Sequence, residues 1–266
     1  MICAAGLKGK TMNFVADMHM HTIASTHAYS TLEEMIAAAA RKGFFAAAIT
    51  DHGAAMPGAP GTWYFQNMKV LPRVFNGVLL LRGQESNVLD YEGNLDLLPE
   101  DASVMEWVVA SMHGPTMMPG KKHTWQDITE AWLQVAENPL VKVIGHCGSE
   151  EFAFDYEKVI PEFGRKGKLV ELNEGTFRVR KKSLKNCAAI MRLCKRHEVR
   201  IIVDSDAHVS AHVGEFAQGE ALLRELDFPE ELVVNSSRER MLEYLREYTC
   251  VPEDPAFKEA VTGGVI

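Results

Sequence analysis

One pattern recurs along this 266-residue chain: an apolar segment of strand length ends at a histidine or an acidic residue, and a segment with helical spacing follows it. The pattern predicts seven strands, at 15–22, 44–50, 78–85, 107–113, 141–146, 168–173 and 200–208. Helices are expected at 32–43 and near 125–137, 155–166, 183–197, 211–225 and 237–247. Strands that alternate with helices pair in parallel through right-handed crossovers. The sequence therefore predicts an α/β fold of the TIM-like barrel type.

Six of the seven predicted strands end within a residue or two of His, Asp or Glu. Parallel strands present their carboxyl ends on one face of a barrel, and barrel enzymes collect their catalytic residues there. Random placement of ten histidines would not concentrate them at strand ends. We therefore expect an active site at the C-terminal face of the strands.

Length and composition are those of one enzyme domain. The chain is 47% hydrophobic and 24% charged, which suits a globular protein with a sizeable core. Barrels of about 250 residues commonly form a single domain. We expect the barrel at 13–250, with an N-terminal tail at 1–12 and a C-terminal tail at 251–266.

Charge and hydropathy exclude several classes of partner. A net charge of -8 argues against a nucleic-acid surface, which usually carries a basic patch. No apolar run reaches the ~18 residues of a membrane helix, and the first fourteen residues lack a secretion signal. Five scattered cysteines without a Cys-x-x-Cys pair indicate reduced thiols. We expect a cytoplasmic protein, and the sequence is compatible with a homo-oligomer.

The first strand closes with His19-Met20-His21, and side chains two apart on a strand point the same way. Paired imidazoles are half of a metal site, and zinc in a catalytic site uses about three protein ligands. Nitrogen and carboxylate donors together suit zinc, manganese or iron, of which we favour zinc. Cys147, beside His146, is either a soft ligand or a small buried residue, and we favour burial. Nine candidates suit three metal ions: His19, His21, His27, His52, Glu85, His113, His146, Asp206 and His208.

These motifs together resemble the PHP (polymerase and histidinol phosphatase) family. The matching segments are Asp17–Thr22, Ser25–Ser30, Ile49–Gly53, Gly83–Glu85, His113, His146 and Ser205–His208. Their order and flanking residues are most similar to the small YcdX-type phosphatases of bacteria, over roughly residues 13–248. The resemblance implies a distorted seven-stranded β/α barrel that holds a trinuclear metal site at its C-terminal face.

The resemblance also implies a role for each ligand. One metal would be held by His19, His21 and Asp206, a second by His113 and His146 with Glu85 bridging these two, and a third by His27, His52 and His208. Three divalent ions create a strongly positive field that favours a phosphate. We expect hydrolysis of a small phosphomonoester by a hydroxide that bridges two metals, without a covalent enzyme intermediate.

Other candidates lie around this set. Arg180 and Lys181 match a basic pair in the similar phosphatases and could grip phosphate oxygens, or could belong to a solvated loop. Asp51 is expected to orient a ligand. Asn173 could do the same, contact substrate, or simply end its strand. The long loop at 53–77 is either a lid or an aromatic staple over the core.

Two other functions stay open. Amidohydrolases, which cleave C–N bonds, also begin with His-x-His, but they typically place a strand-end lysine between metals, and no strand here ends in lysine. A non-catalytic or proofreading module, like the PHP domains of bacterial DNA polymerases, is the other alternative. The acidic charge and the complete ligand set argue against it.

Overall fold

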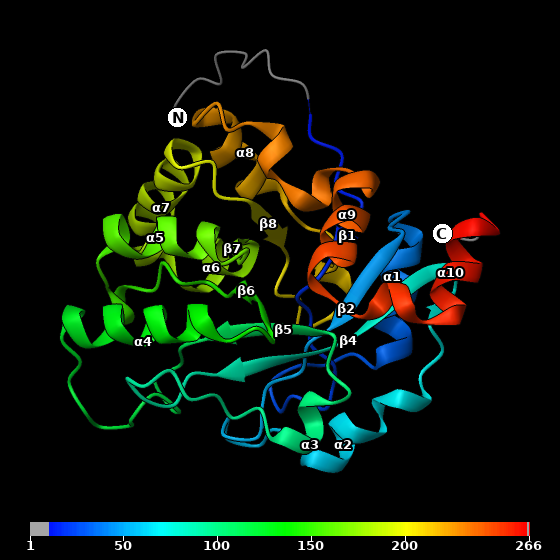
Figure 1. Ribbon diagram of the computed structural model, residues 1–266, viewed down its shortest axis with the longest axis horizontal. Helices are drawn as coiled ribbons and strands as arrows, with labels where there is room; N and C mark the ends of the chain where they lie inside the picture. Colours follow the sequence, from blue (N-terminus) through cyan, green and yellow to red (C-terminus); the bar gives the residue numbers. More distant parts are fainter. Residues whose placement is uncertain (1–10, 265) are drawn as a thin grey trace.

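The computed structural model describes residues 11–264 and 266, so the tail expected at 1–12 lies outside the described residues except for its last two. Seven parallel strands follow the order β1-β2-β4-β5-β6-β7-β8 around a nearly closed barrel (Figure 1). The predicted α/β barrel is thereby confirmed. The strands are β1 (Ala16–Asp17), β2 (Ala46–Ile49), β4 (Val78–Asn87), β5 (Trp107–Ser111), β6 (Val141–Ile144), β7 (Leu169–Asn173) and β8 (Ile201–Asp204), with β3 (Val74–Phe75) antiparallel to the start of β4.

Helices surround the strands (Figure 1). The longer ones are α1 (Leu32–Arg41), α4 (Trp125–Glu137), α5 (Tyr156–Arg165), α7 (Leu184–Arg196), α8 (Ala217–Glu225), α9 (Arg238–Tyr248) and α10 (Pro255–Thr262). Shorter ones are α2 (Thr62–Asn67), α3 (Pro99–Ala102) and α6 (Glu174–Val179). Turns of 3₁₀ helix are η1 (Met68–Val70), η2 (Glu150–Phe152), η3 (Lys181–Ser183), η4 (Ser210–His212), η5 (Glu230–Leu232), η6 (Val234–Ser236) and η7 (Val251–Glu253). None of the helices in the described part of the chain has both the length and the apolar character needed to span a bilayer.

Local sequence sets where the helices begin. Thr31 and Glu34 form a capping box at the start of α1, which satisfies backbone N–H groups that would otherwise lack partners. The helix predicted at 211–225 was placed too early, since only 217–225 is α-helical. Gly214 has φ +69° and its backbone N–H donates to Asp17, so the chain bends there before α8 can begin.

Two apolar clusters lie on opposite faces of the sheet. Along β4, Leu79 and Leu81 face one cluster and Leu80 faces the other, as the alternation of a strand requires. Tyr244 of α9 packs in the first of these clusters, and its hydroxyl donates to the backbone carbonyls of Lys142 and Gly167. These carbonyls lie at or just before the starts of β6 and β7. Helix α9 therefore closes the N-terminal end of the barrel and leaves the C-terminal end for the site.

The last sixteen residues, expected as a tail, pack on this same end. Residues 255–262 form α10, and Phe257 and Ala260 are buried in the cluster beneath α9. An apolar pair three residues apart is too short a pattern to reveal a helix. The barrel's apolar core thus continues beyond residue 250.

The seam between β1 and β8 is closed by side chains more than by strand pairing. Beyond one bridge between Met20 and Ala207, the amide of buried Asn235 donates to the carbonyls of Ala16 at 3.0 Å and Val203 at 2.7 Å. The side-chain oxygen of Asn235 also accepts the backbone N–H of Val203 at 3.1 Å. A single residue of η6, Asn235, thus ties the first strand to the last.

We predict that Asn235→Ala lowers the free energy of unfolding by about 3 kcal/mol, because three buried backbone groups lose their partner. Urea unfolding followed by tryptophan fluorescence measures the change. Exposed Asn67→Ala in α2 is the control, expected within about 0.5 kcal/mol of the parent. Equal stability of the two variants would show that the seam does not depend on Asn235.

Candidate metal centre

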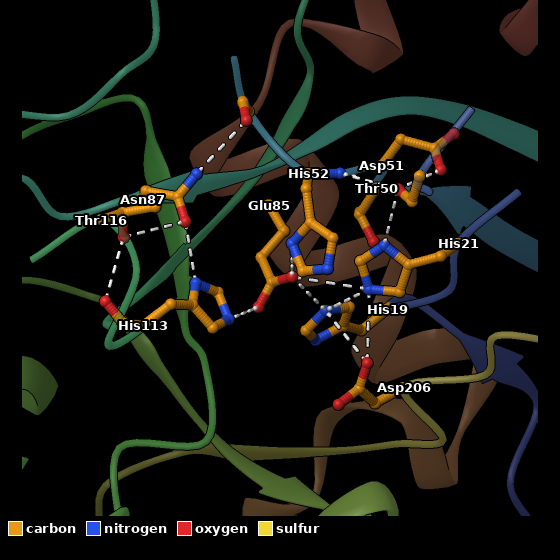
Figure 2. A network of polar contacts seen from close by, with 12 residues as sticks. His19, His21, Thr50, Asp51, His52, Glu85, Asn87, His113, Thr116 and Asp206 are labelled. Atoms are coloured by element: carbon orange, nitrogen blue, oxygen red, sulfur yellow. Dashed lines mark hydrogen bonds and ion pairs between the residues drawn. The ribbon is translucent and has the colours of Figure 1, made fainter. Parts of the chain in front are cut away.

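The nine candidate ligands meet at the C-terminal end of the barrel. His19 and His21 follow β1, and Glu85 lies within β4 (Figure 2). The others follow strands in the same way, except for His27 in the loop before α1: His52 after β2, His113 after β5, His146 after β6, and Asp206 and His208 after β8. The structure therefore brings all nine side chains into one cluster.

Glu85 lies at the centre of the cluster and is 1% exposed. Its Oε1 is 3.0 Å from Nε2 of His146 and 3.4 Å from Nε2 of His113. Its Oε2 is 3.5 Å from Nε2 of both His19 and His21 (Figure 2). One carboxylate thus contacts two separate pairs of imidazoles, one pair through each oxygen.

The other ring nitrogen of several imidazoles is already engaged. Nδ1 of His19 donates to Glu171 Oε1 at 2.6 Å, and Nδ1 of His113 donates to Asn87 Oδ1 at 2.8 Å. A neutral imidazole that donates from Nδ1 has a free lone pair on Nε2. The lone pairs of these histidines therefore point toward Glu85, where a cation would be bound.

Distances between ring nitrogens fit shared metal ions. Nε2 of His19 lies 3.2 Å from Nε2 of His21, and two tetrahedral zinc ligands with bonds of 2.0–2.1 Å are about 3.4 Å apart. Nε2 of His27 lies 3.2 Å from Nε2 of His52 in the same way. The His208 ring lies 4.6 Å from that of His27, centroid to centroid, and completes this second group.

Buried Oε2 of Glu85 also supports a cation. It lies 2.7 Å from Nδ1 of His52, outside hydrogen-bond geometry, and has no hydrogen-bond partner among the described residues. A buried carboxylate oxygen without a donor is costly unless a cation compensates it. The donor set of nitrogen and carboxylate atoms fits zinc, and it also fits manganese or iron.

The pKa shifts of the cluster residues distinguish those that are neutral at pH 7 from those that are charged. Burial and neighbouring imidazoles lower the pKa of His21, and they lower that of His27 to about 4. Both are therefore neutral at pH 7, as a metal ligand must be. Burial alone would raise the pKa of Glu85, but the imidazoles of His52 and His19 outweigh it, so the pKa is well below its usual value. For His19, three carboxylates outweigh burial and raise the pKa, which shows that they favour a cation there, whether a proton or a metal.

Two of the cluster residues occupy a backbone region that only a few side chains adopt. His146 has φ +23° and Asp206 has φ +51°, each two residues beyond the end of a strand. Such conformations persist when the surrounding structure enforces them, and they gather at functional sites. The backbone N–H of His146 donates to Glu171 Oε2 at 2.6 Å, which holds one of them in place.

Glu171 is the clearest residue that the sequence analysis missed. It is buried in β7, accepts from His19 and His146, and its Oε2 also accepts from Asn173 at 3.1 Å. An acidic residue inside an otherwise apolar strand was the available signal. Asn173, for which several roles stayed open, also donates to Asp206 Oδ2 at 3.2 Å while capping α6.

Asp51 acts on the cluster through a serine. Its carboxylate accepts from the backbone of Thr22 at 2.8 Å, from Ser25 Oγ at 2.7 Å and from the Tyr64 hydroxyl at 2.5 Å. Ser25 Oγ lies 3.4 Å from Nδ1 of His21. Asp51 is thus placed to orient His21, as the sequence suggested for a neighbouring ligand.

The segment 53–77 was considered either as a lid or as an aromatic staple over the core. Phe65 is fully buried in the core, whereas Trp63 is 85% exposed. The Tyr64 hydroxyl between them contacts Asp51. The aromatic staple is therefore present at Phe65, and closure of the segment over the site stays a prediction.

The basic pair separates in the structure. Arg180 lines a cavity of about 250 Å³ above the cluster, and its Nη1 is 3.5 Å from Asp206 Oδ2. Lys181 begins η3 and is exposed, and it is not among the residues that line this cavity. Cys147 is buried in the core, and burial raises the pKa of its thiol, which fits the favoured structural role.

The chain resembles known proteins over most of its length. A family model described as the PHP domain matches residues 17–175. A probable phosphatase of Acetivibrio thermocellus is 45% identical over 235 residues, which cover 88% of this chain and 96% of the relative. A probable phosphatase of Clostridium botulinum is 40% identical with the same coverage.

A solved structure gives an independent comparison of the fold. Histidinol phosphate phosphatase of Lactococcus lactis, in complex with zinc, L-histidinol and phosphate, superposes with a TM-score of 0.58 at 18% identity. The match covers 80% of this chain and 94% of that one. The family model spans more than half of the sequence and includes seven of the nine clustered side chains, His19 to His146, and the relatives align over nearly their whole length. The chain therefore belongs to the PHP domain family.

Proposed function

We propose that this protein is a metal-dependent phosphatase that hydrolyses small phosphomonoesters at a cluster of three metal ions, with zinc as the first choice. The observation that carries the proposal is the convergence of imidazole lone pairs and two carboxylates beneath a small cavity. The names of the relatives, probable phosphatases, support the reaction class.

The proposed ligand groups follow the contacts. Nε2 of His21 lies 3.3 Å from Asp206 Oδ1 and 3.2 Å from Nε2 of His19, which supports one group. The rings of His113 and His146 are 5.1 Å apart and both contact Glu85, which supports a second group that shares this carboxylate with the first. The third group consists of His27, His52 and His208.

Metal ions in such a site would activate a water for attack and hold phosphate oxygens during an in-line displacement. The protein would orient the substrate with Arg180, whose guanidinium can donate to two phosphate oxygens at once. Cys147 is not a candidate nucleophile, because burial keeps it a neutral thiol. A cavity of about 250 Å³ limits the substrate to a small ester.

C–N hydrolysis through a strand lysine finds no support at the site. Lys142 and Lys168 lie at the opposite end of the barrel, where Nζ of Lys168 donates to the carbonyls of Asn138 and Val141. Neither lysine lines the cavity above the cluster. The phosphatase proposal therefore fits the described residues better.

We predict that purified protein contains about three metal ions per chain and that a chelator abolishes phosphate release until zinc is restored, because the nine ligands have no other common role. Elemental analysis and a screen of small phosphomonoesters measure both. A metal-free active protein would contradict the proposal. So would a metal-loaded protein that acts only on amides or DNA ends.

We predict that Glu85→Gln lowers kcat/KM by about a hundredfold or more, because the amide cannot supply a negative charge to two metal ions. Circular dichroism is expected to show an unchanged fold. Exposed Glu92→Gln is the control for a lost charge outside the site. Full activity of the Glu85 variant would rule out the shared carboxylate.

We predict that Glu171→Gln weakens metal binding by about 10–100-fold, the usual cost of losing a partner behind a ligand. The amide nitrogen of glutamine would face an N–H of His19 or His146, both of which need an acceptor. Titration against a chelator of known affinity measures the change. Unaltered affinity would mean that Glu171 only fills space in the barrel.

A further inference from the structure

An acidic side chain without a cationic partner borders the cavity above the metal centre. Glu151 in η2 lines this cavity together with Glu85, His113 and Arg180. Its carboxylate lies beside Gly114, where an added Cβ atom would be 2.9 Å from Oε1. Among residues 11–264, none of the ion pairs includes Glu151, and the nearby arginine pairs with Asp206 instead. The cavity therefore has a metal-binding wall and an acidic edge.

The side chains that line the adjoining cavity, of about 320 Å³, do not balance the negative charge of Glu151. Of this cavity's two arginines, Arg180 is the one proposed to hold the first phosphate, and Arg178 is paired with Glu215 at 3.6 Å. His212 also lines it, and histidine carries at most a partial charge at neutral pH. Among the described residues that line either cavity, a second phosphate on a substrate would find no arginine or lysine other than these two.

The remaining wall of the first cavity is apolar. Met56, Met112, Pro115 and Phe152 line it beside Glu151. A short carbon chain would pack on these side chains while its phosphate end occupies the metal-binding wall. The far end of the substrate would then lie near the carboxylate.

We propose that Glu151 is a specificity-determining residue that selects against a second anionic group on the leaving alcohol, so that the substrates are monophosphates with neutral or cationic leaving groups. The inference rests on the proposed phosphatase function. A sphere of 250 Å³ is about 8 Å across, comparable with the Debye length of ~8 Å at physiological ionic strength. Glu151 is exposed, so water and salt screen part of the repulsion across the cavity, and the expected effect on kcat/KM is about threefold.

Three esters of one carbon skeleton test the proposal with the zinc-loaded protein: 3-hydroxypropyl phosphate, 3-aminopropyl phosphate and propane-1,3-diyl bisphosphate. They share a three-carbon skeleton, and their far groups are neutral, cationic and anionic in turn. Phosphate release gives kcat/KM for each with the parent, Glu151→Gln and Glu150→Gln. Glu150 is the matched control, because it is an exposed acid of the same 3₁₀ turn, as Glu151 is, but does not line the cavity.

In Glu151→Gln, the ratio of kcat/KM for the bisphosphate to that for the hydroxypropyl ester is expected to rise about threefold, and the ratio for the aminopropyl ester to fall. Glu150→Gln is expected to keep the parent's ratios. Equal ratios in the parent and Glu151→Gln would overturn the role of Glu151 while leaving the phosphatase in place. An equal change of these ratios in both variants would show that only the net charge of the protein matters, and it would overturn the role of Glu151 as well. Hydrolysis of none of the esters would instead contradict the proposed function, and the inference with it.

Discussion

A buried carboxylate surrounded by imidazoles is the interaction on which the site depends. Glu85 is almost fully shielded from water, and four histidines lie within 3.5 Å of its two oxygens through their Nε2 atoms. Burying a charge without a partner is costly, and neutral imidazoles alone do not balance it. A cation shared by the carboxylate and the lone pairs would resolve the imbalance. The same requirement explains why Glu171 and Asn87 engage the Nδ1 atoms, since they turn the lone pairs inward.

The barrel makes this convergence possible because its strands are parallel and tightly spaced. In β4, a side chain at Gly83 would meet the carbonyls of Trp107 and Ile49 at 2.7 and 2.9 Å, so glycine is required for the two neighbouring strands to approach. Residues 79–82 pair with β2 and residues 83–87 with β5, which makes this strand the link between both halves of the sheet. Glu85 lies in the second of these segments, two residues beyond the glycine. The carboxylate of Glu85 is therefore placed at the centre of the cluster by β4, the strand that joins the two halves of the sheet.

Much of the fold and the site could be predicted from the sequence because their signals are local. Six of the seven strands lead to a candidate ligand at or near their end, so the pattern revealed both the element and the candidate together, as at His52 and His146. The supporting residues gave weaker signals, since Glu171 acts through contacts with residues more than twenty positions away. The start of α8 depends on a bond between Gly214 and Asp17, and α10 depends on packing against α9; neither is visible within a short window of sequence.

The two ends of the barrel have different physical tasks. At the N-terminal end, Tyr244 and α10 bury apolar surface and satisfy backbone carbonyls, which stabilises the fold. At the C-terminal end, His146 and Asp206 adopt unfavourable backbone angles and polar groups crowd together, which costs stability. A rigid closed end can hold a strained open end in one geometry, and a metal cluster needs ligand positions fixed to a fraction of an ångström. The loops that form the cavity wall, including η2, do not need to be positioned with this precision. Their side chains can therefore differ among PHP proteins without disturbing the cluster, and they are where differences in substrate should arise.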